Sequence, residues 1–502
     1  MLALWAVAWS LLWLDGVRGA RVLFVPQVSK SHKLSMLPLM EAMLRRGHHV
    51  AVFSEQFRPE KLYPAAVEDL MVDMADKSYA TWGGIPFDND TDMAFVLWNL
   101  PTIPLTLHIP WDSGVKLTRS LFRDHMAEFK AVAGGNWDLV VLDVLFSVSG
   151  LALGWAAADS PLLAMSSTRL PPPHVGRRGY PTPSHLVPPF FPLSPTDYDS
   201  GAFKHRLYGA VEWLEHEAAD KLILPALVHP LLQQALPGFQ LERFYAASAG
   251  WTYEYLDRLP WPEPLGREFK PTSYDCQAGT SRHNQPLPKD IEAFVSSPES
   301  KGTIMIAFGT MVDWKLAPPH ILQAFVSVLR NLSDYRVLWS YKGTPPQIQE
   351  EHILFRPWLP QPSLLADSRT RLFVSHGGLK SFKETLCAAV PVLYMPMFAE
   401  QLRNALLARR WGYGEAVSKW GVTGEGLGAA FHTVLDNWPE YKAKAVRARG
   451  LWDDRLIPAV DEAAHFAELI IRHKGLPRAY WNSAMNFCLH HLHFTHDFGV
   501  QK

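Results

Sequence analysis

A pair of glycines between an apolar run and a helical pattern is the clearest chemical signal in this chain. Residues 371–375 are apolar enough for one buried strand, His376, Gly377 and Gly378 follow at once, and residues 379–387 have helical spacing. Glycines permit a tight turn and a close approach of backbone to ligand, and the first N–H groups of a helix can bind an anion. The spacing therefore predicts a phosphate site, in which His376 and Ser381 add side-chain donors.

The residues around this unit have the chemistry to hold the rest of a nucleotide sugar. Trp358 offers a flat surface on which a base can stack. Glu384 lies one helix turn after the serine, and its carboxylate can accept from ribose hydroxyls. Glu400 and Gln401 stand just past an expected strand, residues 391–397, where ligands of open α/β sheets bind, and they can read sugar hydroxyls. Each feature alone is common in other contexts, so it is the ordered set that indicates a nucleotide-sugar site.

In their order and spacing, these residues resemble the signature of the UDP-glycosyltransferases, glycosyltransferase family 1, whose animal members include the UDP-glucuronosyltransferases. The family pattern runs W-x-P-Q, H-G-G, a Ser, a Glu, G-V-P and D-Q. It stands here as Trp358 with Gln361, His376 to Gly378, Ser381, Glu384, Ala389 to Pro391, and Glu400 with Gln401. Ala389 replaces a usual Gly, which we expect to be a minor packing change. Glu400 replaces the usual Asp and lengthens the sugar-reading carboxylate by one methylene.

The resemblance implies an α/β fold of the GT-B type, in which two Rossmann-like domains face each other across a cleft and a C-terminal helix crosses back. It also implies the binding residues of the second domain. After an expected strand at residues 302–308, Gly309 and Thr310 resemble a family loop whose hydroxyl meets the diphosphate, with Ala307 in place of its first Ser. The implied UDP-binding residues are Thr310, Trp358, Gln361, His376, Gly378, Ser381 and Glu384, and the implied donor-sugar residues are Glu400 and Gln401.

Two residues of the first half are the candidates for catalysis. Glycosyl transfer to a hydroxyl needs a base, and histidine side chains titrate near neutral pH. A surface or capping role is the default for any one of 21 histidines, but His32 resembles the catalytic histidine of the family in its place after the first strand. Asp143 ends the expected strand 137–143 and matches the family's Asp, which steadies the imidazolium. Asp138 starts that strand and is expected at the opposite sheet edge.

The elements that position these two residues read as the start of a Rossmann-like domain. Residues 21–26 form an expected buried strand, residues 27–33 a polar loop, and Ser35 an N-cap for a helix that ends near Gly47. A turn-rich linker is expected near residues 261–285. The expected division is a signal peptide at 1–19, an acceptor domain at 20–284, a UDP-sugar domain at 285–454, and a crossing helix with tail at 455–502.

Composition limits the function classes. The 502 residues are 48% hydrophobic and 19% charged, with a net charge of -1, which excludes a disordered chain and argues against a nucleic-acid binder. Three cysteines, Cys276, Cys387 and Cys488, predict neither a disulfide framework nor a zinc site. Two D-x-D triplets, at 88–90 and 197–199, resemble metal sites of the other glycosyltransferase fold, but neither follows an apolar strand. We therefore expect exposed loops there and no metal.

The two ends of the chain indicate where in the cell the protein is located. Residues 2–14 are apolar over the length of a signal-peptide core, although a buried helix is the alternative, and Asn89 and Asn331 begin glycosylation sequons. Residues 479–502 hold no apolar run long enough to span a bilayer, and their histidine-rich stretch reads as a terminal helix in preference to a metal site. The expected location is the secretory pathway, in the endoplasmic reticulum lumen or secreted, with membrane association at most peripheral.

Taken together, the sequence predicts an inverting, metal-independent transfer of a glucuronosyl or glucosyl group from a UDP-sugar to a hydroxyl of a small lipophilic acceptor. In the family that the chain resembles, segments such as 82–122, rich in aromatic residues, Leu and Pro, and the proline-rich loop 169–196 line the acceptor pocket, and their apolar composition suggests a small lipophilic acceptor. Lys380 or Arg403 can face a donor carboxylate. The expected partners are UDP-glucuronate or UDP-glucose, with no cofactor, no nucleic acid and a possible homo-oligomer. A catalytically silent relative remains the alternative, whereas a NAD enzyme is disfavoured because the loop after the first strand has no glycine.

Overall fold

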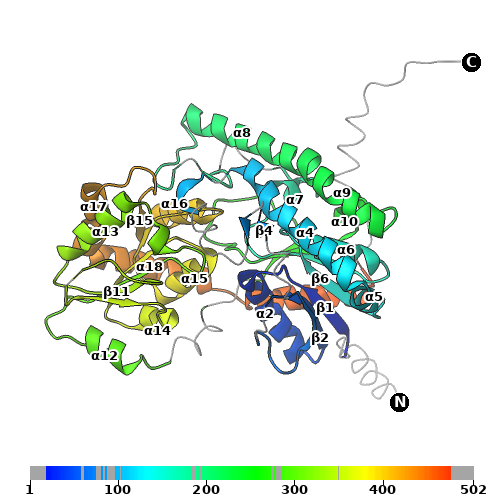
Figure 1. Ribbon diagram of the computed structural model, residues 1–502, viewed down its shortest axis with the longest axis horizontal. Coiled ribbons are helices and arrows are strands. Elements are labelled where there is room, and N and C mark those ends of the chain that lie inside the picture. Colours follow the sequence, from blue (N-terminus) through cyan, green and yellow to red (C-terminus); the bar gives the residue numbers. More distant parts are fainter. Residues whose placement is uncertain are drawn as a thin grey trace, which may run out of the picture.

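Two parallel sheets, each covered by helices, make up the computed structural model (Figure 1). It describes residues 19–57, 61–74, 81–82, 85–86, 97–101, 103–181, 187–192, 194–272, 276, 285–348 and 350–475. The predicted signal-peptide core, the Asn89 sequon, the 88–90 triplet and the histidine-rich tail lie outside these residues.

The first sheet has seven parallel strands in the order β3-β2-β1-β6-β7-β8-β9. Its strands are β1 Arg21–Val25, β2 His49–Gln56, β3 Glu68–Asp73, β6 Leu139–Asp143, β7 Leu162–Ser166, β8 Gly250–Tyr253 and β9 Phe269–Pro271. The central strands are runs such as LVVLD that are buried throughout, as expected for a parallel sheet with both faces covered. The last strand, β9, lies inside the turn-rich stretch expected near residues 261–285 and within the expected first domain, 20–284.

Helices cover both faces of this sheet. The helical elements of the first half are α2 Lys30–Arg45, η2 Pro104–Leu107, α4 His108–Asp124, α5 Met126–Ala133, α6 Val148–Ala156, α7 Pro172–Gly176, α8 Phe203–Ala218, η3 Ala219–Ile223, α9 Leu224–Ala235 and α10 Leu241–Ala247. Two short strands, β4 Thr81–Trp82 and β5 Ile85–Pro86, pair separately. In Figure 1, α8 runs along the outer rim of the molecule, above α4.

The predicted start of α2 is wrong. The helix begins at Lys30, not at Ser35, so His32 lies in its first turn and not in a loop. Ser35 is buried inside the helix, and its hydroxyl donates to the carbonyl of Ser31 at 2.9 Å. The first turn carries polar residues that contribute nothing to the hydrophobic pattern, and a helix start is read mainly from that pattern. In the sequence, this polar turn therefore has the pattern of a loop.

The second sheet has six parallel strands in the order β12-β11-β10-β13-β14-β15. Its strands are β10 Thr303–Ala307, β11 Arg336–Ser340, β12 Ile353–Arg356, β13 Thr370–Ser375, β14 Val392–Tyr394 and β15 Gly414–Ala416. Its helices are α12 Lys289–Val295, η4 Trp314–Leu316, α13 Pro319–Arg330, α14 Gln361–Ala366, α15 Leu379–Ala388, α16 Gln401–Trp411, α17 Gly424–Asp436 and α18 Trp438–Asp453. The strand expected at residues 391–397 is shorter than predicted.

Ala389 corrects a second expectation. It caps α15 with φ 51° and ψ 44°, in the left-handed region that favours glycine. The exchange of the family's usual Gly for Ala is therefore a matter of backbone conformation and not only of packing. The cap still satisfies the helix end, because the Ala389 N–H donates to the carbonyl of Leu386 at 3.0 Å.

The last described helix, α19 Ala459–Arg472, returns to the first sheet, which confirms the predicted crossing. Val460, Ala463 and Ile470 share one buried cluster with Val22 and Met36 of the first domain. Glu468 fixes the helix there, since its carboxylate accepts from Arg46 at 3.0 Å and lies 3.2 Å from His48 Nε2. Within the described part of the chain, no helix is both long and apolar enough to cross a membrane.

A disulfide joins Cys276 to Cys387, with a Cα–Cα distance of 5.1 Å. The sequence predicted no disulfide framework, and this pair was missed. Its members are 111 residues apart, and only the fold brings the connecting segment beside α15. Spacing along the chain cannot reveal such a pair.

Candidate active site

The imidazole of His32 and the carboxylate of Asp143 meet at the carboxyl edge of the first sheet. His32 stands in the first turn of α2, which follows β1, and Asp143 is the last residue of the adjacent β6. His32 Nδ1 lies 2.6 Å from Asp143 Oδ2, and Ser167 Oγ, just past β7, lies 2.8 Å from the same nitrogen. Ser167 was not foreseen, because its position one residue after a strand becomes meaningful only when β6 and β7 are neighbours.

The hydrogen-bonding chemistry of the two groups decides which of them is the donor in this contact. The Asp143 side chain is fully buried, and its second oxygen accepts from the N–H of Leu145 at 2.9 Å. An ionised carboxylate can only accept, so the proton between the two groups belongs to His32 Nδ1. The Nε2 atom is then the nitrogen that can take a proton, and the His32 side chain is 19% exposed. Asp138 accepts instead from the N–H of Arg21 at 2.8 Å, at the far edge of the sheet, as expected.

The phosphate-type turn forms as predicted between β13 and α15. Gly377 has φ 81°, and Gly378 is the N-cap of the helix. A Cβ atom on Gly378 would lie 2.5 Å from Nε2 of His376, so the turn has no room for a side chain. The ring of His376 stacks on Phe308, with 6.2 Å between centroids. Burial lowers the pKa of His376 to about 4, so at neutral pH it can offer an uncharged N–H donor.

Three predicted UDP-binding residues are joined by hydrogen bonds. The amide of Gln361 donates to Ser381 Oγ at 3.0 Å and to Glu384 Oε2 at 2.6 Å. Trp358 lies nearby in sequence, and 69% of its surface is exposed, which leaves its indole open to stacking. Thr310 is exposed, and its carbonyl accepts from Lys342 at 2.7 Å.

The two candidate sugar-reading residues are both buried. Gln401 Oε1 accepts from the N–H groups of Met397 and Phe398, at 2.9 Å and 3.2 Å, so its oxygen holds the loop after β14. Burial raises the pKa of Glu400, while Thr168 and His32 of the first domain act in the opposite direction. Glu400 is therefore near the His32 side of the cleft.

Comparison with known proteins identifies the family of this chain. The model of the UDP-glucoronosyl and UDP-glucosyl transferase family matches residues 243–494, half of the chain. The chain belongs to this family. A UDP-glucuronosyltransferase of Pleuronectes platessa is 35% identical over 225 residues, covering 45% of this chain and 47% of that protein. UDP-glucuronosyltransferase 1A1 of Homo sapiens is 25% identical over 478 residues, covering 91% and 83%.

Solved glycosyltransferases share the fold of this family member. Medicago truncatula UGT71G1, crystallised with UDP-glucose, superposes with a TM-score of 0.59 at 15% identity, over 90% of this chain and 98% of that one. The glycotransferase of kitacinnamycin gives a TM-score of 0.57 at 17% identity, over 92% and 100%. The predicted GT-B architecture is thereby confirmed.

Ionic contacts between the two domains of this transferase were not predicted. Lys383 of α15 pairs with Glu254, the residue after β8, and both are buried. Lys380 donates to Ser35 Oγ of α2 at 3.0 Å and lies 3.4 Å from Glu254. The sequence feature that could have revealed these contacts is a pair of lysines one turn apart in a mostly buried helix, because a buried lysine needs a partner. These contacts tie the donor-side helix to the helix of His32.

The two cations considered for a donor carboxylate differ in this transferase. Arg403 is fully buried, pairs with Glu263 at 2.7 Å and donates to the carbonyl of Pro188. It is therefore committed to holding the two halves together. Lys380 has a side chain that is 36% exposed, and it lies at the cleft.

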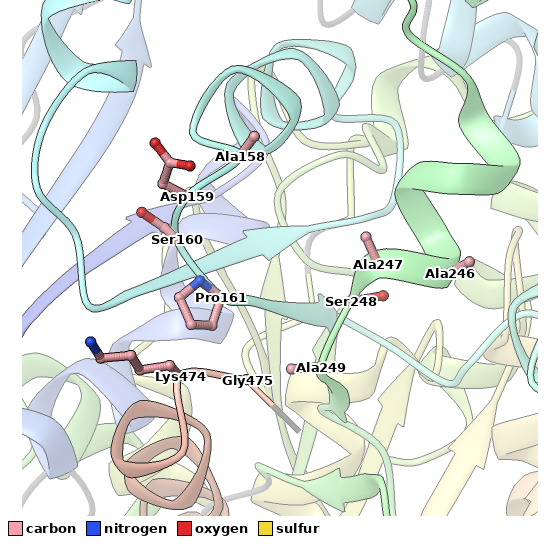
Figure 2. A pocket seen from close by; sticks show the side chains of 10 residues that line it. All are labelled: Ala158, Asp159, Ser160, Pro161, Ala246, Ala247, Ser248, Ala249, Lys474 and Gly475. Carbon is pink, nitrogen blue, oxygen red and sulfur yellow. The ribbon is translucent and has the colours of Figure 1, made fainter. Parts of the chain in front are cut away.

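The hollow drawn in Figure 2 lies at the wrong edge of the sheet for this chemistry. It encloses about 240 Å³ and is lined by residues that precede β7 and β8, such as Ser160 and Ala249, and by Lys474 just after α19. His32 and Asp143 lie at the opposite ends of the strands, so the hollow is not the acceptor site.

Among the described residues, no cluster of side chains suits a metal ion, and the 197–199 triplet belongs to none.

Proposed function

We propose that this transferase moves a hexosyl group, glucuronosyl or glucosyl, from a UDP-sugar to a hydroxyl of a small lipophilic acceptor, with inversion and without a metal. The observation that carries the proposal is the 2.6 Å contact between His32 Nδ1 and Asp143 Oδ2 at the carboxyl edge of the first sheet. Family membership supplies the UDP-sugar.

The chemistry of acceptor activation follows from that contact. His32 Nε2 removes the proton of the acceptor hydroxyl as the oxygen attacks the anomeric carbon, and the charge on the imidazolium is steadied by Asp143. The oxygen approaches from the face opposite UDP, so the configuration inverts. Ser167 Oγ, 2.8 Å from Nδ1, supports the orientation of the ring.

Departure of UDP is assisted by groups of the second domain. The proposed UDP-binding residues are Thr310, Trp358, Gln361, His376, Gly378, Ser381 and Glu384, and the proposed sugar-binding residues are Glu400 and Gln401. The start of α15 presents backbone N–H groups to the phosphates, and the neutral His376 adds another donor. Donors fixed in advance where negative charge grows can replace a cation in this role.

The proposed donor carries either a neutral sugar or a carboxylate. Lys380, which is partly exposed although it lies 3.4 Å from Glu254, is the cation that can also face a glucuronate carboxylate, because Arg403 is fully buried. We place the protein in the secretory pathway, in the endoplasmic reticulum lumen or secreted, with a possible homo-oligomeric state. Asn331 is exposed at the end of α13, so its sequon is open to glycosylation.

The test is His32→Ala in the full chain, assayed with UDP-glucuronate and UDP-glucose against phenols and steroids. We expect turnover to be lost while the dissociation constant for UDP, measured by calorimetry, stays nearly unchanged, since His32 belongs to the other domain. Turnover by the variant at the normal rate would overturn the proposal. A wild-type protein that binds UDP but transfers no sugar would instead support a catalytically silent relative.

A further inference from the structure

A short segment of the first half, residues 97–100, is anchored inside the second domain. The side chain of Trp98 is 1% exposed and lies in the core cluster of that domain, not of its own. Its ring centroid is 5.2 Å from that of Trp314 and 6.5 Å from that of Phe308. Its Nε1–H donates to the carbonyl of Asp313 at 2.9 Å. The indole therefore combines apolar packing with a satisfied polar group across the domain boundary.

Lys419 holds the backbone of the same segment. Its ammonium donates to the carbonyl of Leu97, to that of Leu100 at 2.9 Å, and to that of Met397 at 3.0 Å. The lysine is 5% exposed, and burial lowers its pKa to about 8. Three carbonyl groups match the three donors of an ammonium group, so one side chain ties the inserted segment to the loop after β14.

Trp98 and Lys419 each contact a residue that in turn contacts the proposed donor site. Phe308, on which Trp98 packs, stacks in turn on the ring of His376. Met397, which accepts from Lys419, donates its N–H to Gln401 Oε1. A movement of the inserted segment would reach both His376 and Gln401 through these shared neighbours.

We propose that Trp98 and Lys419 are positioning residues of the donor site, which hold His376 and Gln401 in their binding geometry from the other side of the cleft. The affinity for the UDP-sugar then depends on a segment of the acceptor half. This inference rests on the proposed function, since it assumes that UDP binds beside His376.

The test compares two variants with two matched controls in the full chain, with UDP as the probe in calorimetry. Trp98→Phe removes the indole N–H and part of the ring, and Lys419→Met removes the ammonium. Trp137→Phe is the control for the first, because Trp137 donates to the carbonyl of Val132 at 2.7 Å within the first domain. Lys442→Met is the control for the second, because Lys442 donates to the carbonyl of Ala389 at 2.7 Å, at the far end of α15.

We expect the dissociation constant for UDP to rise roughly tenfold in Trp98→Phe and in Lys419→Met, and to stay unchanged in both controls, although all four variants lower the thermal midpoint. In turnover assays, the KM for the donor should rise while the KM for the acceptor stays the same. Lys419→Arg, which keeps the charge, should recover part of the UDP affinity.

Unchanged UDP affinity in Lys419→Met and in any soluble Trp98 variant would overturn the inference and leave a purely structural role. An equal loss of affinity in the controls would overturn it as well, because the effect would then follow stability and not position. Failure of the wild-type protein to bind UDP would contradict the proposed function itself. The failure of this inference and the failure of the proposed function are therefore distinguishable.

Discussion

The imidazole of His32 is held by Asp143, and Ser167 Oγ lies 2.8 Å from the same nitrogen. Asp143 is fully buried and receives two donors, one from His32 Nδ1 and one from the N–H of Leu145. A carboxylate in that position accepts at both oxygens, so the ring is held with its proton on Nδ1. The catalytic role that we propose for the aspartate rests on this orientation as much as on its charge.

The first prediction concerns Asp143→Asn. The amide can donate to Nδ1 and would favour the tautomer with its proton on Nε2, which cannot take a proton from the acceptor. We expect kcat to fall by roughly 10²–10⁴ with little change in structure. Steady-state kinetics would measure the fall, and UDP calorimetry on the same variant should show unchanged affinity. A variant that keeps more than about half of the kcat would contradict the role of the tautomer.

Individual residues were predictable where the signal was local. His376, Gly377, Gly378 and Ser381 fall within six positions, and the turn they predict is present. Their roles in binding UDP stay predictions. Ser167, Trp98 and Lys419 carry no such signal, because each acquires a partner only when strands or domains distant in sequence come together.

The helices α2 and α15 are the elements that bring the two halves of the site together. Lys380 of α15 joins the two helices by its contact with Ser35 of α2. Lys380 and Lys383 also both pair with Glu254. The polar first turn of α2 hid its true start from the hydrophobic pattern, while the apolar face of α15 made that helix readable. Elements were thus predictable where they bury apolar residues and less so where they line the cleft.

The second prediction concerns this ionic contact and pH. Burial would raise the pKa of Glu254, but Lys380 and Lys383 lower it to about 2, below its ordinary value of 4.5. A carboxyl group whose pKa is lower in the folded state contributes stability above pH 4.5, and that contribution is lost as the pH falls towards 2. Thermal unfolding of the wild type and of Glu254→Gln across this range would measure it.

At pH 7 we expect Glu254→Gln to be less stable by roughly 3–5 kcal/mol, because the ammonium of Lys383 stays buried without that carboxylate. The difference should shrink as the pH falls from 4.5 towards 2, where the wild-type carboxyl is itself protonated. A matched control is Glu440→Gln, whose carboxylate pairs with Lys444 in an exposed i,i+4 contact. A difference that stays constant with pH would argue against the lowered pKa.

The whole molecule consists of two parallel sheets, and a covalent bridge ties the segment that follows the first sheet to a helix of the second domain. The disulfide pairs Cys276, which precedes the second sheet, with Cys387 near the end of α15. It encloses a loop that contains β10, β11, β12 and β13. The overall architecture was predictable because the alternation of strands and helices repeats, whereas the bridge was not, because it depends on a contact between distant segments.

The third prediction is that removing this bridge lowers the stability of the folded state. The Cys276→Ser, Cys387→Ser variant should lose roughly 2–5 kcal/mol, as expected for closure of a long loop. Denaturant titration under oxidising conditions would measure the change, and Cys488→Ser, which leaves both members of the pair in place, is the control. Equal stability of all three proteins would mean that the bridge contributes nothing.

The return of α19 to the first sheet also sets an order of events during synthesis. One face of that sheet is completed by Val460, Ala463 and Ile470, some 440 residues after Val22. A chain that leaves the ribosome from its N-terminus therefore exposes an apolar surface of its first domain until nearly all of the second has been made. We infer that this surface is where molecular chaperones have the longest time to bind the nascent protein.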